Sequence, residues 1–195
     1  MMPADWFDEA YFDRGGVKSN YSRYTETIAP FAAYVDALAT FLAAHGEPSG
    51  GPVLDVGCAK GYLVAELRRR GIEAYGVDVS AYALAQAAPA VAPHLYQGSA
   101  TALGAALNFT RGAKFAAVCS FDVLEHFDEG HARQAIREAA AISRHQLHQV
   151  NTGWCPAVAF EGDESHALKL SLDDWRRLAQ EEHCPNTVFT ETGRA

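Results

Sequence analysis

The feature that most constrains this chain is the stretch from residue 52 to residue 80, PVLDVGCAKGYLVAELRRRGIEAYGVDVS. A short apolar run, of the kind buried in parallel sheets, leads into a turn bracketed by Gly57 and Gly61, where backbone must pass close to a ligand. Helical spacing follows, and then a second apolar run that closes on Asp78. The stretch predicts a strand, a helix and a strand over residues 53–56, 62–70 and 74–79. This arrangement is half of a nucleotide-binding βαβ unit.

Strands and helices continue to alternate along the rest of the chain. The apolar spacing predicts further strands over residues 94–97, 115–121, 146–152 and 187–191, and helices over residues 28–44, 81–87, 131–143 and 172–182. Such alternation indicates an α/β fold with a doubly wound, mostly parallel sheet. Ligands of these sheets bind beyond the carboxyl ends of the strands, so the candidate residues are those that follow each predicted strand.

Composition argues against several classes of function. The formal net charge of -8 disfavours a large nucleic-acid footprint, and no apolar run approaches membrane-spanning length. The N-terminus is acidic and aromatic, unlike a signal peptide. The four cysteines form no CxxC pair, which predicts free thiols and a cytoplasmic protein. The eight histidines show no metal-ligand spacing, so no metal is expected.

Two classes of nucleotide cofactor compete for the 52–80 unit. A dinucleotide site requires G-x-G-x-x-G, and counted from Gly57 this chain has Ala59 and Tyr62 in place of the second and third glycines. Asp55 precedes the turn, and a carboxylate there is a poor neighbour for a pyrophosphate and a good one for an ammonium group. Asp78 is placed to accept hydrogen bonds from ribose hydroxyls, which both classes use.

Three segments together carry a resemblance to a known family. VLDVGCAKGYLVAEL, GVDVS and FAAVCSFDVLEHF resemble class I S-adenosylmethionine-dependent methyltransferases, and most closely their small-molecule branch, over roughly residues 50–145. The resemblance implies the Rossmann-like methyltransferase fold, S-adenosylmethionine as cofactor and S-adenosylhomocysteine as product. Such folds usually close with an antiparallel hairpin, yet only 13 residues follow Glu182. We therefore expect either truncated C-terminal strands or an exposed sheet edge beyond residues 146–152, an edge that would suit a homodimer.

The resemblance also implies which residues hold the cofactor. Those that it places around the methionine part, the ribose and the adenine are Asp55, Gly57, Cys58 (through its backbone), Gly61, Asp78, Val79, Ser99, Ala100 and Phe121. Two departures from the family pattern stand out. Ala59 replaces the middle glycine of the turn, and Ser99 replaces the acid that usually receives the adenine amine.

The aromatic N-terminal segment allows two interpretations. It is either a surface arm that covers the fold or a lid over the ligand, in which Tyr21 and Tyr24 close over the cofactor. We expect a single domain over residues 1–195. Its parts are an N-terminal arm and helix acting as a lid, a cofactor-binding core, and a substrate-side loop with a helix and the last strand, over residues 1–46, 50–152 and 153–195.

Methyl transfer from a sulfonium needs alignment, exclusion of water and sometimes a base. The catalytic candidates are His126, which follows the 115–121 strand, and His166 in the segment GDESH, where Asp163 stands three residues before the imidazole. For His126 the competing interpretation is a structural hydrogen bond or a helix cap. For His166 it is a solvated loop.

The sequence therefore predicts a methyltransferase that transfers the methyl group of S-adenosylmethionine to an oxygen or nitrogen of a small molecule. Its expected state is a monomer or a homodimer, with no nucleic-acid or membrane partner. Two alternatives stay open. One is a cofactor-binding module without catalysis, and the other is an NAD-dependent oxidoreductase, which Asp55, Ala59 and Tyr62 together disfavour.

Overall fold

A six-stranded parallel sheet forms the centre of the molecule. The computed structural model describes residues 2–14, 18–19, 21, 23–27, 31–45, 51–107, 114–152 and 165–191. Its strands follow the order β3-β2-β1-β4-β5-β6, and every neighbouring pair is parallel. They are β1 (Val53–Val56), β2 (Ala74–Asp78), β3 (Leu95–Gln97), β4 (Ala117–Phe121), β5 (Gln146–Val150) and β6 (Thr187–Glu191). The predicted α/β class with a doubly wound sheet is confirmed.

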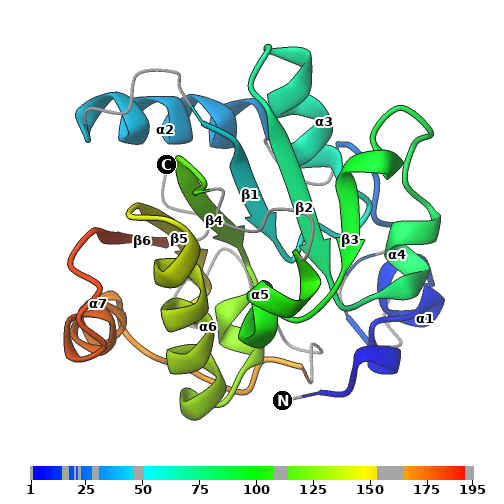
Figure 1. The fold of residues 1–195 in the computed structure, drawn as a ribbon. Helices are drawn as coiled ribbons and strands as arrows, with labels where there is room; N and C mark the ends of the chain where they lie inside the picture. Colours follow the sequence, from blue (N-terminus) through cyan, green and yellow to red (C-terminus); the bar gives the residue numbers. More distant parts are fainter. Residues whose placement is uncertain are drawn as a thin grey trace.

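Helices cover both faces of the sheet (Figure 1). The described α-helices are α1 (Glu9–Phe12), α2 (Phe31–Ala44), α3 (Tyr62–Arg69), α4 (Ala81–Ala85), α5 (Leu103–Ala106), α6 (Glu129–Ile142) and α7 (Leu172–Glu181). Successive side chains of a strand point to opposite faces. Accordingly Val53 joins a core with α2 and α3, whereas Leu54 and Val56 join a second core with α5, α6 and α7.

Short 3-10 turns link these elements. They are η1 (Ala4–Trp6), η2 (Ala92–His94), η3 (Ala100–Ala102) and η5 (Leu124–His126). η5 follows β4 directly and carries the predicted catalytic residue His126, so a short turn and not a loop places this side chain. The sequence pattern gave no sign of η5, because three residues are too few for a periodic signal.

The last strand differs from the closing hairpin that such folds usually have. β6 pairs in parallel with β5 from Gln146↔Thr187 to Val150↔Glu191. The edge of β5 is therefore covered, and β6 itself is the outer strand on this side of the sheet. Ser171 caps α7 through a capping box with Asp174, as its position before a helical pattern predicts.

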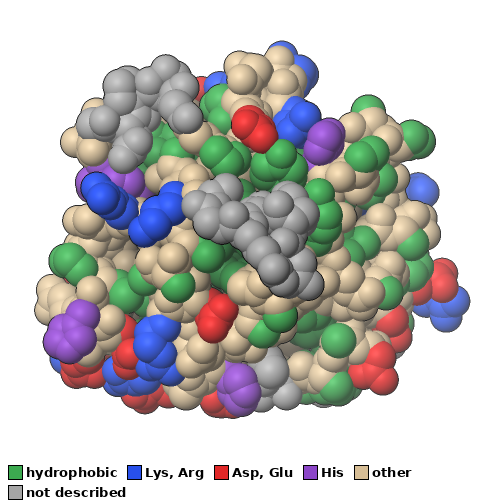
Figure 2. All heavy atoms as spheres, viewed as in Figure 1, with side chains coloured by type: hydrophobic (Ala, Val, Ile, Leu, Met, Phe, Trp, Pro, Cys, Tyr) green, Lys and Arg blue, Asp and Glu red, His purple; other side chains and the backbone are tan. Residues whose placement is uncertain are grey.

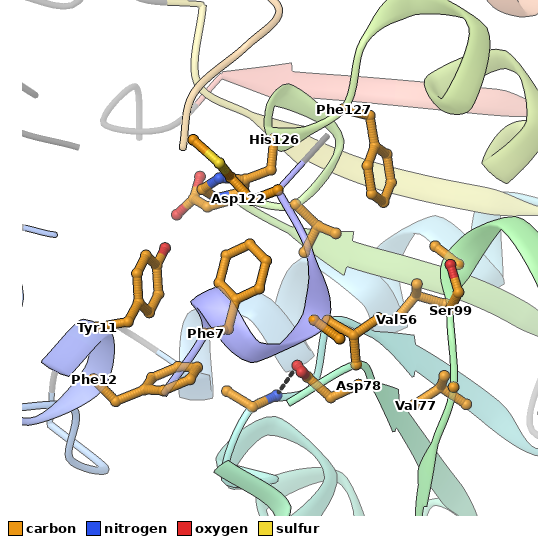
Figure 3. A pocket seen from close by; sticks show the side chains of 18 of the residues that line it. Phe7, Tyr11, Phe12, Val56, Val77, Asp78, Ser99, Asp122, His126 and Phe127 are labelled. Atoms are coloured by element: carbon orange, nitrogen blue, oxygen red, sulfur yellow. Dashed lines mark hydrogen bonds between the residues drawn. The ribbon is translucent and has the colours of Figure 1, made fainter. Parts of the chain in front are cut away.

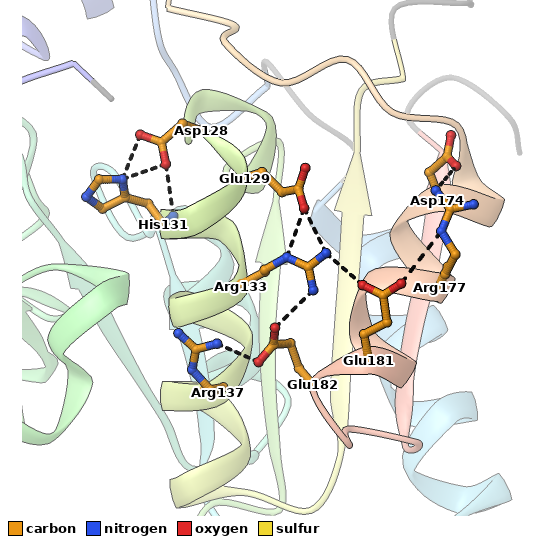
Figure 4. A network of polar contacts seen from close by, with 9 residues as sticks. All are labelled: Asp128, Glu129, His131, Arg133, Arg137, Asp174, Arg177, Glu181 and Glu182. Atoms are coloured by element: carbon orange, nitrogen blue, oxygen red, sulfur yellow. Dashed lines mark hydrogen bonds and ion pairs between the residues drawn. The ribbon is translucent and has the colours of Figure 1, made fainter.

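Charges of both signs gather over α6 and α7 (Figure 2). Arg133 on α6 contacts Glu129, Glu181 and Glu182 at 2.7, 2.7 and 3.0 Å, and Arg137 also pairs with Glu182 (Figure 4). Hydrogen bonds from Arg137 and Arg133 lower the pKa of Glu182. Exposed pairs of this kind contribute little individually, but here they link two helices that cover the same face of the sheet.

Two further features concern the cysteines and the length and polarity of the helices. Cys58, Cys119 and Cys184 are free buried thiols, while Cys155 lies outside the described residues. Among the helices of the described part of the chain, none has both the length and the apolar character that crossing a bilayer requires.

Candidate functional site

A cavity of about 280 Å³ opens at the carboxyl ends of the strands. The ends of β1, β2 and β4 and the loop after β3 form its floor, and residues from the N-terminal segment form its roof. Of the residues predicted to bind cofactor, those that line it are Gly57, Asp78, Val79, Ser99, Ala100, Phe121 and Tyr21. The parallel sheet thus brings together residues that are far apart in the sequence, as the strand-end argument predicts.

Asp78, at the end of β2, is the best-fixed polar group of the cavity. Its Oδ2 accepts a hydrogen bond from the backbone N–H of Ala59 at 2.7 Å (Figure 3). Its Oδ1 accepts one from the backbone N–H of Ser80, also at 2.7 Å. Burial raises the pKa of this carboxyl, and the backbone hydrogen bonds oppose the rise. Two amides orient the carboxylate, and each oxygen keeps a lone pair for a ligand hydroxyl.

Asp55 lies on β1 and is not part of the cavity lining, although it is buried directly beneath the glycine turn. Burial and the neighbouring Asp78 carboxylate raise the pKa of Asp55 to about 8. No hydrogen bond from another described residue offsets that rise. The side chain is thus a buried acid that is largely protonated at neutral pH and would gain from a nearby cation.

The glycine turn has the conformation that the sequence predicts. Gly57 has φ +78°, and a Cβ atom built on it would lie 2.3 Å from Cγ2 of Val123. Gly61 has φ +79°, and its Cβ would lie 2.7 Å from Cδ1 of Leu95. Ala59 between them also has a left-handed φ of 48°. Both glycines are therefore required, and Ala59 adopts a conformation that a glycine would take without strain.

Cys58 and Gly61 shape the turn without lining the cavity. The Cys58 side chain is buried against Gly76 of β2, where a Cβ would come within 2.6 Å of its sulfur. Burial, followed by the charges of Asp78 and Asp55, raises the pKa of the Cys58 thiol well above its usual value. These two residues hold the glycine turn against β2 and β3.

Ser99 and Ala100, which follow β3, and Phe121, the last residue of β4, line the cavity. Ser99 Oγ caps η3 by accepting a hydrogen bond from the Thr101 N–H at 3.2 Å and also pairs with the Thr101 hydroxyl at 2.8 Å. Phe121 stacks on Tyr34 of α2 with ring centroids 4.2 Å apart. The serine that replaces the family's acid is therefore engaged in a local turn while it lines the cavity.

The two predicted catalytic histidines lie next to each other. The His126 and His166 rings meet edge to face with centroids 4.6 Å apart. His126 lines the cavity, and its Nδ1 lies 2.8 Å from the hydroxyl of the buried Ser165. His166 stands behind it, outside the lining. Asp163 and Glu164, which the sequence placed beside His166, fall outside the described residues.

Sequence reasoning did not assign two contributions to this cavity. The first is Asp122, which follows β4 in a left-handed conformation with φ 55° and lines the cavity. The second comes from Phe7, Tyr11 and Phe12. The N-terminal segment was expected to act as a lid, but only Tyr21 and Tyr24 were named as residues that close over the cofactor. Figure 3 shows the Phe7 ring between Asp78 on one side and Asp122 and His126 on the other. The aromatic run of residues 6–12 was a usable signal, but it did not show where the segment would lie.

No cluster of three or more His, Cys, Asp or Glu side chains in the described ranges is arranged to hold a metal ion. Lys and Arg are likewise missing from the described residues that line the cavity. Its charged groups are the carboxylates of Asp78 and Asp122. The cavity is therefore suited to a neutral or cationic ligand with hydroxyl groups.

Several solved structures share the fold of this chain. The chain aligns with a putative methyltransferase from an antibiotic biosynthesis pathway of Anabaena variabilis ATCC 29413 at 22% identity and TM-score 0.59, over 81% of this chain and 63% of that one. It aligns with magnesium protoporphyrin IX methyltransferase of Synechocystis PCC 6803 at 20% identity and TM-score 0.55, over 77% and 71%. A third is CalS10, an amino pentose methyltransferase of Micromonospora echinaspora, at 20% and 0.53, over 68% and 55%.

These alignments confirm the fold, and for two of the three enzymes the chain covers less than two thirds of their length. A comparison with curated proteins gave no match. The family described as "Methyltransferase domain" matches residues 24–193, which is most of the chain. The resemblance carried by the glycine turn, by Asp78 and by the segment after β4 is thereby confirmed, and the chain belongs to the methyltransferase domain family.

Proposed function

We propose that this protein transfers the methyl group of S-adenosylmethionine to an oxygen or nitrogen atom of a small molecule. One observation carries the proposal. Asp78 faces the cavity from the end of β2, and a hydrogen bond from Ala59 ties it to the glycine turn. The family match supports methyl transfer, and the Synechocystis and Micromonospora structures contain S-adenosylhomocysteine and S-adenosylmethionine, respectively.

The residues present fit this cofactor better than NAD. Asp78 would accept hydrogen bonds from the ribose hydroxyls, with Val79, Ser99 and Ala100 beside the adenine. Asp55 is a buried acid without a hydrogen-bond donor among the described residues, which suits the ammonium group of the methionine part. NAD carries a pyrophosphate, and none of the described cavity residues is a Lys or Arg that would neutralise it. The charge of the cavity therefore favours the sulfonium compound.

When bound, the cofactor supplies an electrophilic methyl group, and the protein has to align the acceptor and keep water away. Phe7 and Tyr11 cover the cavity from the N-terminal segment and exclude solvent from it. The hydrogen bond between Ser165 and Nδ1 of His126 fixes the orientation of the imidazole. His126 then serves as the group that orients the acceptor or takes its proton, and the His166 ring supports it from behind.

Calorimetry with S-adenosylmethionine, S-adenosylhomocysteine and NAD tests the cofactor. We expect the first two to bind, and binding of NAD alone would refute the proposal. A screen of small-molecule acceptors that detects S-adenosylhomocysteine then tests turnover. Cofactor binding without turnover of any acceptor would instead support a non-catalytic module. Full turnover by the His126→Ala, His166→Ala double variant would exclude acid–base chemistry at both positions.

The free buried thiols fit a reducing compartment, and we propose the cytoplasm as the site of action. We further propose a monomer or a homodimer that needs no nucleic acid. Size-exclusion chromatography with light scattering distinguishes the two states.

A further inference from the structure

The glycine turn carries a buried cation that cofactor binding does not explain. Lys60 lies between Ala59 and Gly61, and its side chain is only 8% exposed. Its Nζ donates hydrogen bonds to both carboxylate oxygens of Asp13 at 2.8 Å and to the carbonyl oxygen of Tyr24 at 3.0 Å. All these acceptors belong to the N-terminal segment, so the ammonium group joins this segment to the cofactor turn.

Asp13 is the centre of the contact. The Tyr82 hydroxyl, from α4, donates a hydrogen bond to its Oδ2 at 2.8 Å, and the Tyr24 N–H donates one to its Oδ1 at 3.3 Å. Burial raises the pKa of Asp13, but the hydrogen bonds from Lys60 and Tyr82 outweigh it, and the pKa lies below its usual value. Asp13 is therefore a carboxylate at neutral pH, and because both side chains of the pair are largely buried, loss of either partner leaves the other group without its counterpart.

The contact between Asp13 and Lys60 also positions the aromatic residues that cover the cavity. Tyr11 and Phe12, the two residues before Asp13, are buried against Ala59 of the glycine turn and Ala83 of α4. The Ser80 hydroxyl also donates a hydrogen bond to the Phe7 carbonyl oxygen. Phe7, Tyr11 and Phe12 line the cavity, yet all precede residue 24, where the match to the family begins. These residues of the roof therefore lie outside the stretch that the family match covers.

We propose that Asp13 and Lys60 form a positioning pair that holds the N-terminal segment on the glycine turn and thereby completes the ligand cavity. The role in the cavity depends on the proposed cofactor, whereas the holding of the segment does not. Neither side chain lines the cavity itself. The pair acts on the cavity through the aromatic residues that it holds in place.

Trypsin tests the pair without any ligand. Arg14, Lys18 and Arg23 are cleavage sites within the segment, and cleavage reports how often the segment leaves the core. We expect Lys60→Met and Asp13→Asn to raise cleavage there by about tenfold or more. Lys60→Arg, which keeps the charge, should stay near the wild-type rate. The control is Glu9→Gln, because the Glu9–Arg14 pair is exposed (51% and 63%) and its loss should change nothing.

Two comparisons make the result decisive. If the residues act as a pair, Asp13→Asn combined with Lys60→Met raises cleavage no further than the stronger single variant. Fully multiplicative effects, or unchanged cleavage in the single variants, would overturn the proposal. Thermal unfolding of each variant separates a loosened segment from a loosened core. Only loss of the core would also unwind α6 and α7 and allow cleavage of their backbone beside the arginines.

Calorimetry with S-adenosylhomocysteine tests whether the pair also completes the ligand cavity. We expect Lys60→Met to weaken binding by about tenfold, and Glu9→Gln to bind like the wild type. Faster cleavage with unchanged affinity would show that the pair does not position the cavity. A wild-type protein that fails to bind S-adenosylhomocysteine would refute the proposed function, while the protease experiment would still decide whether Asp13 and Lys60 hold the segment.

Discussion

The backbone N–H of Ala59 donates a 2.7 Å hydrogen bond to the carboxylate of Asp78, which joins the glycine turn to the end of β2. Because the same carboxylate faces the cavity, we expect Asp78→Ala to weaken cofactor binding at least about tenfold, or ~1.4 kcal/mol. Calorimetry with S-adenosylhomocysteine measures the loss. Asp173→Ala removes a carboxylate that is 89% exposed and should bind normally. Unchanged affinity of the Asp78 variant would place the ribose elsewhere.

Cofactor binding at pH 7 should release a proton from Asp55. Its pKa is raised to about 8 by burial and by Asp78, so the free protein holds the proton that an incoming ammonium group would displace. Calorimetry in buffers of different ionisation enthalpy counts the protons released. The count should fall by up to about one in Asp55→Asn. An equal count in both proteins would show that Asp55 does not meet the ammonium group.

The raised pKa of Asp55 also affects folding. The folded chain binds this proton up to pH ~8 and the unfolded chain only up to pH ~4. The contribution of Asp55 to the free energy of unfolding therefore falls as pH rises between these values. Denaturant titrations of Asp55→Asn at several pH values should show a weaker decline than the wild type, and equal slopes would contradict the assignment.

Gly57 and Gly71 form a matched pair for the glycine turn. Both have a left-handed φ, of +78° and +80°, but a Cβ at Gly57 would meet Val123 at 2.3 Å and one at Gly71 would meet nothing within 4 Å. We expect Gly71→Ala to cost ~1 kcal/mol for its φ alone, and Gly57→Ala to cost clearly more and to weaken cofactor binding. Val123→Ala should relieve part of the Gly57→Ala defect. Equal losses in urea denaturation would exclude the steric explanation.

Replacing Asp122 should lower turnover while leaving the stability of the protein nearly unchanged. Its left-handed φ of 55° suits glycine, and its N–H bond to the Gln149 carbonyl does not need the side chain. We expect Asp122→Gly to stay within about 1 kcal/mol of the wild type in stability. Turnover should fall by about tenfold or more, because a cavity carboxylate is lost. Wild-type turnover would remove Asp122 from the site.

The buried His148, which lies away from the cavity, should make the folded protein less stable in acid. It is buried on β5 between the Ser120 hydroxyl at 2.7 Å and Oε1 of Gln146 at 2.9 Å, and burial lowers its pKa to about 3. Since the unfolded chain binds a proton near pH 6.5 and the folded chain does not, this contribution to stability is lost as pH falls below that value, by about 1.4 kcal/mol per pH unit. Urea titrations of His148→Gln should lack this slope, and the exposed His131→Gln should retain it.

Much of the site was predictable because its signals are local. The apolar run before Gly57 and the run that closes on Asp78 define β1 and β2, and the parallel sheet then brings their carboxyl ends to one edge. Strand ends therefore predicted Ser99, Phe121 and His126 at the same cavity as Asp78. The positions of these residues could be predicted without knowledge of the three-dimensional structure.

The roof of the cavity was not predictable in the same way. Asp13 meets Lys60 across 47 residues and Tyr82 across 69, and no periodic pattern in residues 2–14 encodes such partners. Lys60 lies between Ala59 and Gly61 of the turn, where its charge suggests solvent exposure. The adjacency of His126 and His166 has the same cause, because it depends on how the chain returns after β5.

The long reach of these contacts orders the events of folding. The segment that contains Phe7 and Asp13 has its partners in the glycine turn and in α4, up to 73 residues later in the chain. Phe7 and Asp13 cannot settle until β1, α3 and β2 have paired, so the roof docks on a sheet that already exists. A chain that has formed only its central strands would already place Asp78 at the floor of the cavity but would still lack the roof that covers it. Competence for the proposed methyl transfer would therefore arise only after the strands beneath the roof have paired.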